Sequence, residues 1–474
     1  MTQDQKSKAQ RQKSSDENKT SKAPEQTAIN PLLLNPEIQQ WIRQTTATLE
    51  EIAFAPLPFA GVLRQELLQQ VEGYRKTAEK LPRWSEISGL LFPAKISLEQ
   101  CSSETTAHYK AAIVARHFGG DLQSKESRQV HGKLIADITG GFGVDAYYLA
   151  QSGARVHHFE LDELLSDLVR HNMAQLKANV ICHHGDGLKG LQELKQGAQL
   201  DDSKQPLDLI YLDPARRDAQ KNKVFRLEDC KPDILTHLDH LLECSPNILL
   251  KTSPMLDLQL GLRQLKKVTE IHVVAVNNEV KEILWFISRS AGQDDKNQDA
   301  QDDKSRGTQE VTDHKNPKVY AVNLSPKSSA LDSKSAQNND IFEFIWNQRE
   351  SSKYSAPLAY IYEPNGPLRK IGQYAALTQR LPVVRIGPNA HLFTAEQFMD
   401  FPGRIFEVLE KWSFTKPQMN HFKGQKYNIT TRDFPLTVAK IRATWQIKDG
   451  GDEYLFFTTD SDGQKWIILC RKPQ

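Results

Sequence analysis

The sequence predicts an α/β protein with a mostly parallel sheet, and three observations support this prediction. Between residues 133 and 290, short apolar runs alternate with amphipathic stretches, a pattern typical of helices packed on both faces of such a sheet. A glycine-rich turn follows the first apolar run, and acidic residues follow several of the later ones. The seven predicted strands are 134–136, 156–159, 180–182, 209–212, 247–250, 272–276 and 283–287.

The part of the chain before this sheet divides into two regions. Residues 1–29 are rich in Gln, Lys, Ser and Asp and contain few large apolar groups, so we expect a disordered tail. Residues 30–122 are predicted to form an all-α domain, because apolar residues recur there at spacings of three and four. These residues are Ile42, Leu49, Leu63, Leu67, Leu68, Val71 and Tyr74.

The sheet domain is expected to span 123–324. Within it, 291–318 is a polar insertion that we expect to be disordered, and 319–324 is a short strand-like run. A linker at 325–355 follows. Two small α+β modules are predicted at the end of the chain, at 356–402 and 403–474.

Charge, cysteine content and the lengths of apolar runs indicate which classes of protein this sequence can belong to. The 61 Lys and Arg nearly balance the 59 Asp and Glu, but residues 351–474 carry 17 basic against 11 acidic residues, a local net charge of +6. The five cysteines are scattered without the spacing of a metal site, so we expect reduced thiols, no bound metal and a cytoplasmic location. No apolar run has the length of a signal peptide or a membrane span, and no membrane partner is expected.

The strongest local signal is the turn that follows the first predicted strand. Its glycines allow the backbone to approach a ligand closely, and the helix that begins after it offers N–H groups to an anion. The absence of Gly-Lys-Ser/Thr argues against a P-loop. An acid on the strand would repel a pyrophosphate but attract the amino group of S-adenosyl-L-methionine. The residues predicted to bind that cofactor here are Asp137, Thr139, Gly140, Gly141, Gly143 and Asp145.

Two further carboxylates follow the next strands. Glu160 ends the second predicted strand, 23 residues after Asp137, which suits hydrogen bonds to ribose hydroxyls. Asp186 follows the third strand, where it can meet the exocyclic amine of adenine. The carboxyl ends of parallel strands share one edge of a sheet, so we expect all three acids to line one crevice. Each carboxylate taken alone could equally be a solvated loop residue.

Together these motifs resemble the class I S-adenosylmethionine-dependent methyltransferases, whose sheet is Rossmann-like. Within that superfamily the chain is similar to a bacterial group with a THUMP-like C-terminal domain, preceded by a small ferredoxin-like unit. The resemblance runs from about residue 30 to the end, except for the insertions at 291–318 and 325–340. It implies S-adenosyl-L-methionine as cofactor and RNA as substrate. The segments that carry it are 98–104, 137–145, 212–217, 360–374, 428–434 and 448–457.

The segment after the fourth strand, Asp213-Pro214-Ala215-Arg216-Arg217, resembles the Asp/Asn-Pro-Pro-aromatic motif of amino-group methyltransferases. The resemblance implies that Asp213 and the Pro214 carbonyl accept hydrogen bonds from the acceptor amine. Arg216 replaces the aromatic residue and could stack on a base or pair with a phosphate. An ordinary strand-end cap is the structural alternative for Asp213.

The same segment also resembles the Asp-Pro-Pro-Arg motif of RNA 5-methyluridine enzymes. Those enzymes need a cysteine nucleophile after the fifth strand, because C5 of a pyrimidine is too poor a nucleophile unassisted. Here that strand is followed by Lys251-Thr252-Ser253, with no cysteine. Methylation at nitrogen or oxygen is therefore favoured over C5.

A basic stretch near the C-terminus is a candidate RNA-binding surface. Between Glu410 and Asp433 there is no acidic residue, and four aromatic residues are interspersed with the basic ones. A solvated face over an aromatic core is the alternative interpretation, and it is the preferred one for the aromatic residues. The candidate RNA-binding residues are Lys411, Lys416, Lys423, Lys426 and Arg432.

The leading hypothesis is therefore a methyltransferase acting on a base nitrogen of tRNA or rRNA. One alternative is an RNA-binding protein that keeps the methyltransferase fold without catalysis, against which the full set of acidic site residues argues. Another is a small-molecule methyltransferase, for which the basic C-terminal module would have no evident use.

Overall fold

The computed structural model describes residues 29–119, 130–195, 206–216, 226–289, 316–325, 340–346 and 353–473. The tail predicted at 1–29, the insertion at 291–318 and the linker at 325–355 lie largely outside these residues, as does Arg217. Within the described part of the chain, no helix combines the length and the apolar character needed to cross a membrane.

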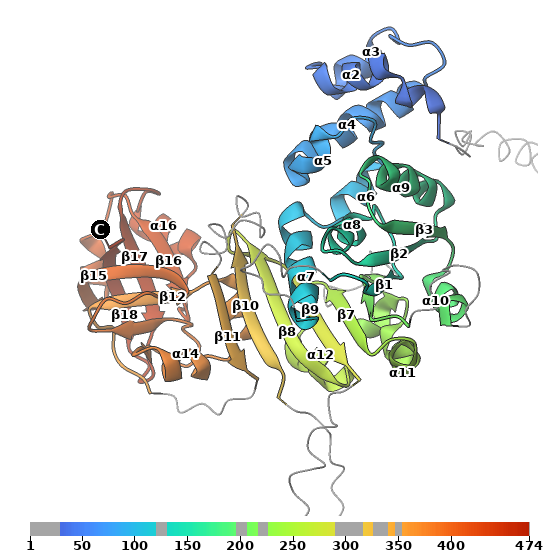
Figure 1. Cartoon of the computed structure of the whole chain (residues 1–474). Helices are drawn as coiled ribbons and strands as arrows, with labels where there is room; N and C mark the ends of the chain where they lie inside the picture. Colours follow the sequence, from blue (N-terminus) through green and yellow to red (C-terminus); the bar gives the residue numbers. More distant parts are fainter. Residues whose placement is uncertain are drawn as a thin grey trace, which may run out of the picture.

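The core of the protein is a mixed sheet in the order β11-β10-β8-β9-β7-β4-β1-β2-β3 (Figure 1). The central strands β3, β2, β1, β4 and β7 are parallel, whereas β9 runs antiparallel to both β7 and β8. The seven predicted strands are all present, and β10 and β11 extend the sheet to nine. The strands are β1 (Leu134–Asp137), β2 (Arg155–Glu160), β3 (Val180–His184), β4 (Leu209–Leu212), β7 (Asn247–Thr252), β8 (Val268–Val276), β9 (Glu279–Ser288), β10 (Lys318–Leu324) and β11 (Asp340–Ile345).

Helices cover both faces of this sheet because successive residues of each buried strand point to opposite sides. Ile135, Tyr211 and Leu249 belong to one apolar cluster, and their neighbours Ala136 and Ile210 belong to another. The first cluster includes residues of α8 and α9, and the second includes residues of α10, α11 and α12. These helices are α8 (Val144–Gln151), α9 (Glu163–Gln175), α10 (Gly187–Lys195), α11 (Ile234–Cys244) and α12 (Leu258–Gln264).

The region before the sheet is helical in its described part. Several of these helices begin at a polar cap: Thr48 and Glu51 form a capping box at α3, and Ser103 caps α7. α7 packs against α8 and β8, so it covers the sheet rather than joining the helices above it (Figure 1). The elements are η1 (Pro31–Leu34), α2 (Pro36–Gln44), α3 (Leu49–Phe54), α4 (Arg64–Lys80), α5 (Pro82–Glu86), α6 (Lys95–Gln100) and α7 (Glu104–His117).

The C-terminal region forms a second sheet, in the order β13-β14-β12-β15-β18-β17-β16. The boundary predicted between two modules at 402/403 falls inside this sheet, because β12 pairs with β15 across it. The elements are β12 (Tyr360–Pro364), α13 (Gly366–Ile371), α14 (Ala375–Arg380), β13 (Val384–Arg385), β14 (Phe393–Ala395), β15 (Gly403–Ser413), α15 (Lys416–Asn420), β16 (Asn428–Arg432), α16 (Val438–Trp445), β17 (Glu453–Thr459) and β18 (Lys465–Arg471).

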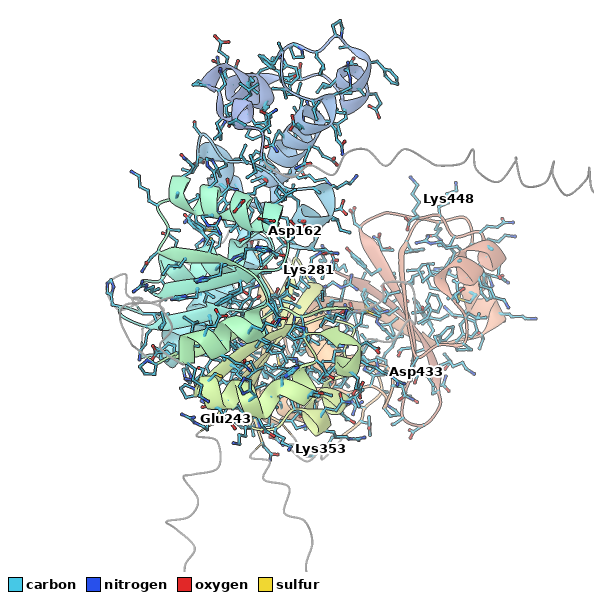
Figure 2. The ribbon with its side chains drawn as sticks, turned by 90° about the vertical axis from the view of Figure 1, so that its right-hand side faces the viewer. Asp162, Glu243, Lys281, Lys353, Asp433 and Lys448 are labelled. Atoms are coloured by element: carbon cyan, nitrogen blue, oxygen red, sulfur yellow. The ribbon has the colours of Figure 1, made fainter. Side chains whose placement is uncertain are left out.

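Helix α13 joins the two sheets. It packs against β8, β9 and β10, and Leu368 and Ile371 share an apolar cluster with Ile271 of β8. The C-terminal region is thereby held against the β8–β10 side of the large sheet (Figure 2).

Candidate active site

The parallel strands bring the predicted acidic residues to one edge of the large sheet. Asp137 is the last residue of β1 and Glu160 is the last residue of β2. Asp213 follows the end of β4, and Asp186 lies two residues beyond β3. β1 pairs in parallel with both β2 and β4, and β2 pairs in parallel with β3, so all four acids lie at the carboxyl edge.

The glycine-rich turn packs directly against the end of β2. Gly140 has a φ of +44°, and a Cβ there would lie 2.5 Å from both the Phe159 carbonyl oxygen and Glu160 Oε2. The Gly141 N–H donates to Glu160 Oε2 at 2.6 Å. Gly143, with a φ of +77°, precedes α8, and a Cβ there would clash with Met173. Glycine at 140 and 143 therefore allows this turn to sit against β2 and α9.

Asp137 is buried at the bottom of this turn. Only 1% of it is exposed, and its Oδ1 accepts the Thr139 N–H at 3.2 Å. Burial raises the pKa of Asp137 well above its ordinary value, and the charges of Asp145 and Asp213 add to this while the Thr139 bond opposes it. A cationic group placed beside Asp137 would favour its carboxylate form.

Asp186 takes a more exposed position. Its Oδ1 accepts the N–H groups of Leu188 at 2.8 Å and Lys189 at 3.3 Å, in the first turn of α10. The carboxylate thus caps this helix at the carboxyl edge, with its side chain open to solvent.

Asp145 is part of a buried polar network rather than of the turn's surface. Its Oδ2 accepts the hydroxyls of Ser102 and Tyr211, each at 2.7 Å, and its Oδ1 lies 3.2 Å from Lys110 Nζ. Burial would raise the pKa of Asp145, but Lys110, Lys251 and the two hydroxyl bonds outweigh it and lower that pKa. The residue predicted to bind cofactor thus has both carboxylate oxygens in contact with protein groups.

Lys110 comes from α7 and is fully buried. Its ammonium donates to both carboxylate oxygens of Glu282, at 2.8 and 3.0 Å, and to Ser102 Oγ at 3.0 Å. Burial raises the pKa of Glu282, and the attraction of Lys110 and Lys251 offsets only part of that effect. The network connects α7 to strands far away in the sequence. Sequence reasoning missed both residues, although a lysine directly before the apolar run 111–115 was a signal.

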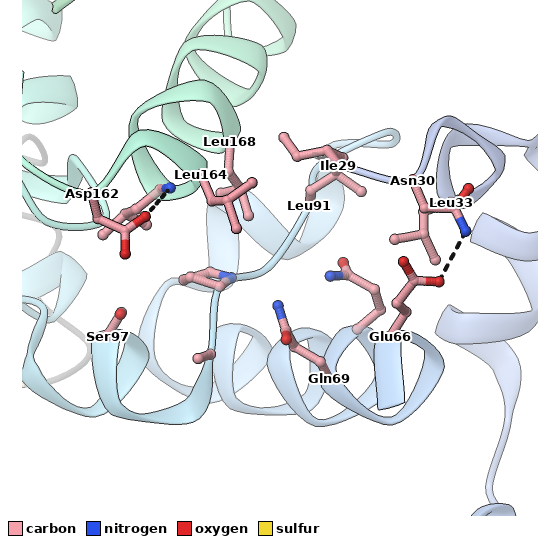
Figure 3. A pocket seen from close by; sticks show the side chains of 14 residues that line it. Ile29, Asn30, Leu33, Glu66, Gln69, Leu91, Ser97, Asp162, Leu164 and Leu168 are labelled. Carbon is pink, nitrogen blue, oxygen red and sulfur yellow. Dashed lines mark hydrogen bonds between the residues drawn. The ribbon is translucent and has the colours of Figure 1, made fainter. Parts of the chain in front are cut away.

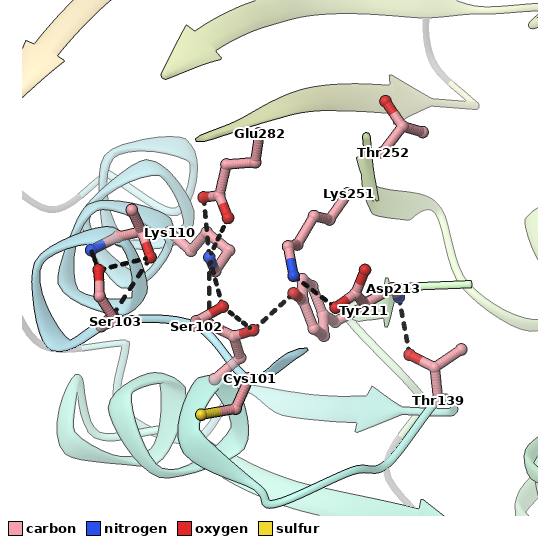
Figure 4. A network of polar contacts seen from close by, with 12 residues as sticks. Cys101, Ser102, Ser103, Lys110, Thr139, Tyr211, Asp213, Lys251, Thr252 and Glu282 are labelled. Atoms are coloured by element: carbon pink, nitrogen blue, oxygen red, sulfur yellow. Dashed lines mark hydrogen bonds and ion pairs between the residues drawn. The ribbon is translucent and has the colours of Figure 1, made fainter. Parts of the chain in front are cut away.

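Lys251 is a third residue of this site that sequence reasoning missed. It lies in β7, and its ammonium is 2.5 Å from Asp213 Oδ2 (Figure 4). Burial would lower the pKa of Lys251, but Asp213, Glu282 and Asp145 outweigh it and raise the pKa above its ordinary value. Lys251 is therefore a cation at neutral pH. The signal was a lysine at the end of an apolar strand, directly beside the predicted acceptor motif.

Asp213 is held from two sides. Its carboxylate contacts Lys251, and its backbone N–H donates to Thr139 Oγ1 at 2.7 Å. Pro214 is buried, and Ala215–Arg216 form β5, which pairs with β6 (Cys230–Lys231) beside the 3₁₀ turn η2 (Leu227–Asp229). The side chain of Arg216 lies outside the described part of the structure. Thr139 thus links the predicted cofactor turn to the predicted acceptor motif.

A pocket of about 200 Å³ opens near this edge, between α4, residues 91–97 and the start of α9 (Figure 3). Gln69, Leu165 and Asp162 are among its lining residues. The Asp162 N–H donates to Glu160 Oε1 at 2.8 Å, so the pocket adjoins the end of β2. Its lining includes none of the predicted cofactor-binding residues.

The candidate RNA-binding residues of the C-terminal region have different environments. Lys416, Lys423 and Lys426 are exposed, whereas Lys411 donates to the Pro357 carbonyl. Arg432 pairs with the buried Glu363. The four aromatic residues of this stretch, Trp412, Phe414, Phe422 and Tyr427, pack in one apolar cluster, as the core interpretation predicts.

Comparison with protein families identifies the C-terminal region. Residues 360–402 match a ferredoxin-like domain, and residues 403–472 match a THUMP domain-like family. No curated protein matches the sequence.

One solved structure resembles nearly the whole chain. A protein of Porphyromonas gingivalis W83, assigned as a methyltransferase, is 29% identical with a TM-score of 0.74, and the match covers 92% of this chain and 98% of that one. Two weaker matches cover less than half of this chain. One is a protein of Pyrococcus horikoshii assigned as an RNA methyltransferase. It is 17% identical with a TM-score of 0.29, and the match covers 45% of this chain and 96% of that one. The other is the 16S rRNA N2 G1207 methyltransferase of Thermus thermophilus, 14% identical with a TM-score of 0.28, covering 42% and 46%.

Proposed function

We propose that this chain, a class I methyltransferase with a THUMP-like C-terminal domain, methylates a base nitrogen of tRNA or rRNA at the carboxyl edge of its large sheet. The observation that carries the proposal is the pairing of Asp213 with Lys251 beside the buried Asp137. Thr139 links the two acids, because its hydroxyl accepts the Asp213 N–H and its own N–H donates to Asp137. Two sites, one for a cationic cofactor and one for a hydrogen-bonding acceptor, are thereby adjacent.

The residues at this edge fit S-adenosylmethionine, which when bound supplies a methyl group activated by its sulfonium. Asp137 is a buried carboxylate whose raised pKa shows that it lacks a cationic partner strong enough to offset its burial. The amino group of the cofactor would provide that partner. The start of α8 offers N–H groups to the cofactor's carboxylate, and Glu160 and Asp186 remain our candidates for ribose and adenine.

Asp213 and Pro214 would hold the acceptor amine. The Asp213 carboxylate can accept an N–H from the exocyclic amine of a base, and the Pro214 carbonyl can accept a second. Two such bonds orient the nitrogen, and orientation is most of what methyl transfer to a good nucleophile requires. Asp213 also provides a base for the proton that the amine loses.

Lys251 is a positioning residue in this scheme. Its ammonium fixes the Asp213 carboxylate in one place, and Thr139 fixes the backbone at the same residue. An acceptor held by Asp213 is thus placed relative to the cofactor turn through the side chain of Thr139.

The proposal of RNA as substrate rests on the C-terminal region. This region carries a net charge of +6 from residue 351 onward and matches the THUMP domain-like family. Its helix α13 is hydrogen-bonded to the loop between β8 and β9, at the carboxyl edge, through the Gly366 N–H and Asn278 Oδ1 at 2.5 Å. An RNA bound to this region would therefore lie close to the edge that holds Asp213.

The test is transfer of a tritium-labelled methyl group from S-adenosylmethionine to unmodified tRNA and rRNA transcripts. We expect acid-precipitable label that ribonuclease releases and that nucleoside analysis places on a base nitrogen. Asp213→Ala should reduce the rate by about a hundredfold or more, with binding of S-adenosylhomocysteine retained. Binding of S-adenosylhomocysteine without transfer to any RNA, or label on a carbon atom, would overturn the proposed substrate or acceptor.

A further inference from the structure

One buried carboxylate in the C-terminal region is surrounded by three arginines. Glu363, near the end of β12, is only 2% exposed in its side chain. Arg404 donates to its Oε2 from Nε at 2.6 Å and from a terminal nitrogen, and Arg432 contacts Oε1 in the same two-point manner. Arg369 lies 3.5 Å from Oε1. These arginines come from α13, β15 and β16, so we call Glu363, Arg369, Arg404 and Arg432 the arginine cluster.

The cluster has more positive charge than its carboxylate can neutralise. A single arginine would satisfy Glu363, and each additional guanidinium adds repulsion between like charges. The three side chains remain 35%, 46% and 28% exposed for Arg369, Arg404 and Arg432, so their guanidiniums are accessible from solvent.

The positive charge of these arginines also lowers the pKa of a neighbouring histidine. Burial lowers the pKa of His391, and Arg385, Arg432 and Arg369 lower it further, whereas Asp433 acts in the opposite direction. Arg369, Arg385 and Arg432 are therefore close enough to His391 for their charges to act on it together.

The cluster lies along the same sheet edge as the proposed active site. β8 is parallel to β7, because β9 is antiparallel to both, so the turn after β8 is at the carboxyl edge. Gly366 is packed against this turn so closely that a Cβ would lie 2.4 Å from the Asn278 carbonyl oxygen. Glu363 and Arg369 are each three residues from Gly366.

The sheet order gives the spacing along this edge between Asp213 and the turn after β8, against which Gly366 packs. From β8 to β4 there are three strand spacings, which is about 14 Å at ~4.8 Å each. That distance corresponds to roughly four nucleotides at ~3.4 Å per step. Figure 2 shows Asp162 and Lys281, which mark this edge, at one end of the sheet domain, and Glu243 at the other end.

We propose that Arg369, Arg404 and Arg432 form a site for RNA backbone phosphates, held ready by Glu363, that guides the strand toward Asp213. Guanidinium forks bind phosphate oxygens in pairs, and a carboxylate that orients them in advance reduces the entropy lost on binding. This inference rests on the proposed RNA substrate and adds to it a specific contact at the junction of the two C-terminal modules.

The test measures binding of fluorescein-labelled tRNA and an rRNA transcript by anisotropy across a salt series. The variant is Arg369→Gln with Arg404→Gln, which leaves Arg432 paired with Glu363 so that the buried carboxylate keeps a partner. The control is Lys465→Gln with Lys472→Gln, which removes the same charge from two exposed lysines of this region that are not candidate RNA-binding residues. Thermal unfolding and binding of S-adenosylhomocysteine establish that both variants are folded.

We expect the arginine variant to bind RNA at least tenfold more weakly and to reduce the slope of log K against log salt by about 1.5 to 2. The lysine variant should lose less affinity. Wild-type-like RNA binding by the arginine variant, or an equal loss in both variants, would overturn the cluster's role while leaving the proposed function intact. Failure of the wild type to bind any RNA would overturn both.

Discussion

Three acidic side chains in and beside the candidate active site share two lysines. Asp145 and Glu282 contact Lys110, and Asp213 contacts Lys251. Among the described residues no lysine contacts Asp137, which accepts its hydrogen bonds from Thr139. The distribution of charge therefore leaves Asp137 as the carboxylate that gains most from a cationic ligand, and this difference among similar residues could not be derived from the sequence.

The raised pKa of Asp137 predicts that, without cofactor, the free energy of unfolding depends on pH. Because the folded state holds the proton more tightly than the unfolded state, whose pKa is about 3.9, the folded state binds more protons between these two values. The contribution of protonated Asp137 to the free energy of unfolding is thus complete below the pKa of the unfolded state, and it is lost as pH rises through the pKa of the folded state.

We therefore expect Asp137→Asn to be more stable than the wild type at neutral pH without cofactor, with the difference shrinking as pH falls towards 4. Thermal unfolding of both proteins over a pH series measures this. If the unfolding temperatures of the two proteins changed with pH in parallel, Asp137 would not be a buried carboxylate with a raised pKa.

The Asp213–Lys251 pair predicts a separation of catalysis from cofactor binding. Lys251→Met removes the cation that positions Asp213, so we expect kcat for RNA methylation to fall by roughly ten- to a hundredfold, the value of a charged hydrogen bond. Binding of S-adenosylhomocysteine should change little. Lys251→Arg should recover part of the rate. If methionine and arginine variants lose activity and cofactor binding together, Lys251 acts on the fold and not on Asp213.

At the scale of elements, the turn between β1 and α8 was predictable and the use of its individual glycines was not. The sequence places glycines at 140, 141 and 143, but only the structure shows which of them lies against another strand. A Cβ on Gly140 would meet the backbone of β2, whereas a Cβ on Gly141 would meet nothing within 4 Å.

This contrast makes Gly140→Ala and Gly141→Ala a matched pair. Both glycines have positive φ, so either alanine costs about 1–2 kcal/mol in backbone strain. Gly140→Ala must also displace β2 or the turn, so we expect a larger loss of unfolding free energy and weaker binding of S-adenosylhomocysteine. Chemical denaturation measures the former and calorimetry the latter. Equal effects of the two substitutions would show that the close contact with Phe159 is not required.

Helix α7 shows why element type was easier to predict than element placement. Its helical character was expected, and it was assigned to the N-terminal helical domain. The structure instead places it on the sheet, where Lys110 reaches Glu282, 172 residues away. An amphipathic pattern shows that a helix has a buried face, but it does not show which surface covers that face.

At the scale of the whole molecule, the order of the chain predicted the large sheet well. Alternation of strands and helices favours parallel pairing, and all seven expected strands formed. The additions at β10 and β11 and the C-terminal sheet shared by two modules depend on pairing between distant strands. Arg369, Arg404 and Lys251 were missed for the same reason, because their partners are distant in sequence. Arg432 was a predicted RNA-binding residue, but its pairing with Glu363 was not predicted.

The whole-molecule arrangement links the two proposals. The residues proposed for the cofactor lie at the ends of β1 and β2 and after β3, Asp213 follows β4 beside Lys251 of β7, and the arginine cluster is joined through Gly366 to the turn after β8. The two proposals together therefore place cofactor, acceptor base and RNA backbone in the order of the strands along this edge.

The most direct test of the central claim is calorimetric titration of the whole protein with S-adenosylhomocysteine, beside Asp137→Asn. We expect saturable one-to-one binding of S-adenosylhomocysteine to the wild type. Its affinity for the variant should be lower by roughly ten- to a hundredfold, since a charged hydrogen bond contributes about 1.5–3 kcal/mol. Absence of binding to the wild type, or equal affinity in the two proteins, would contradict a cofactor site at the end of β1.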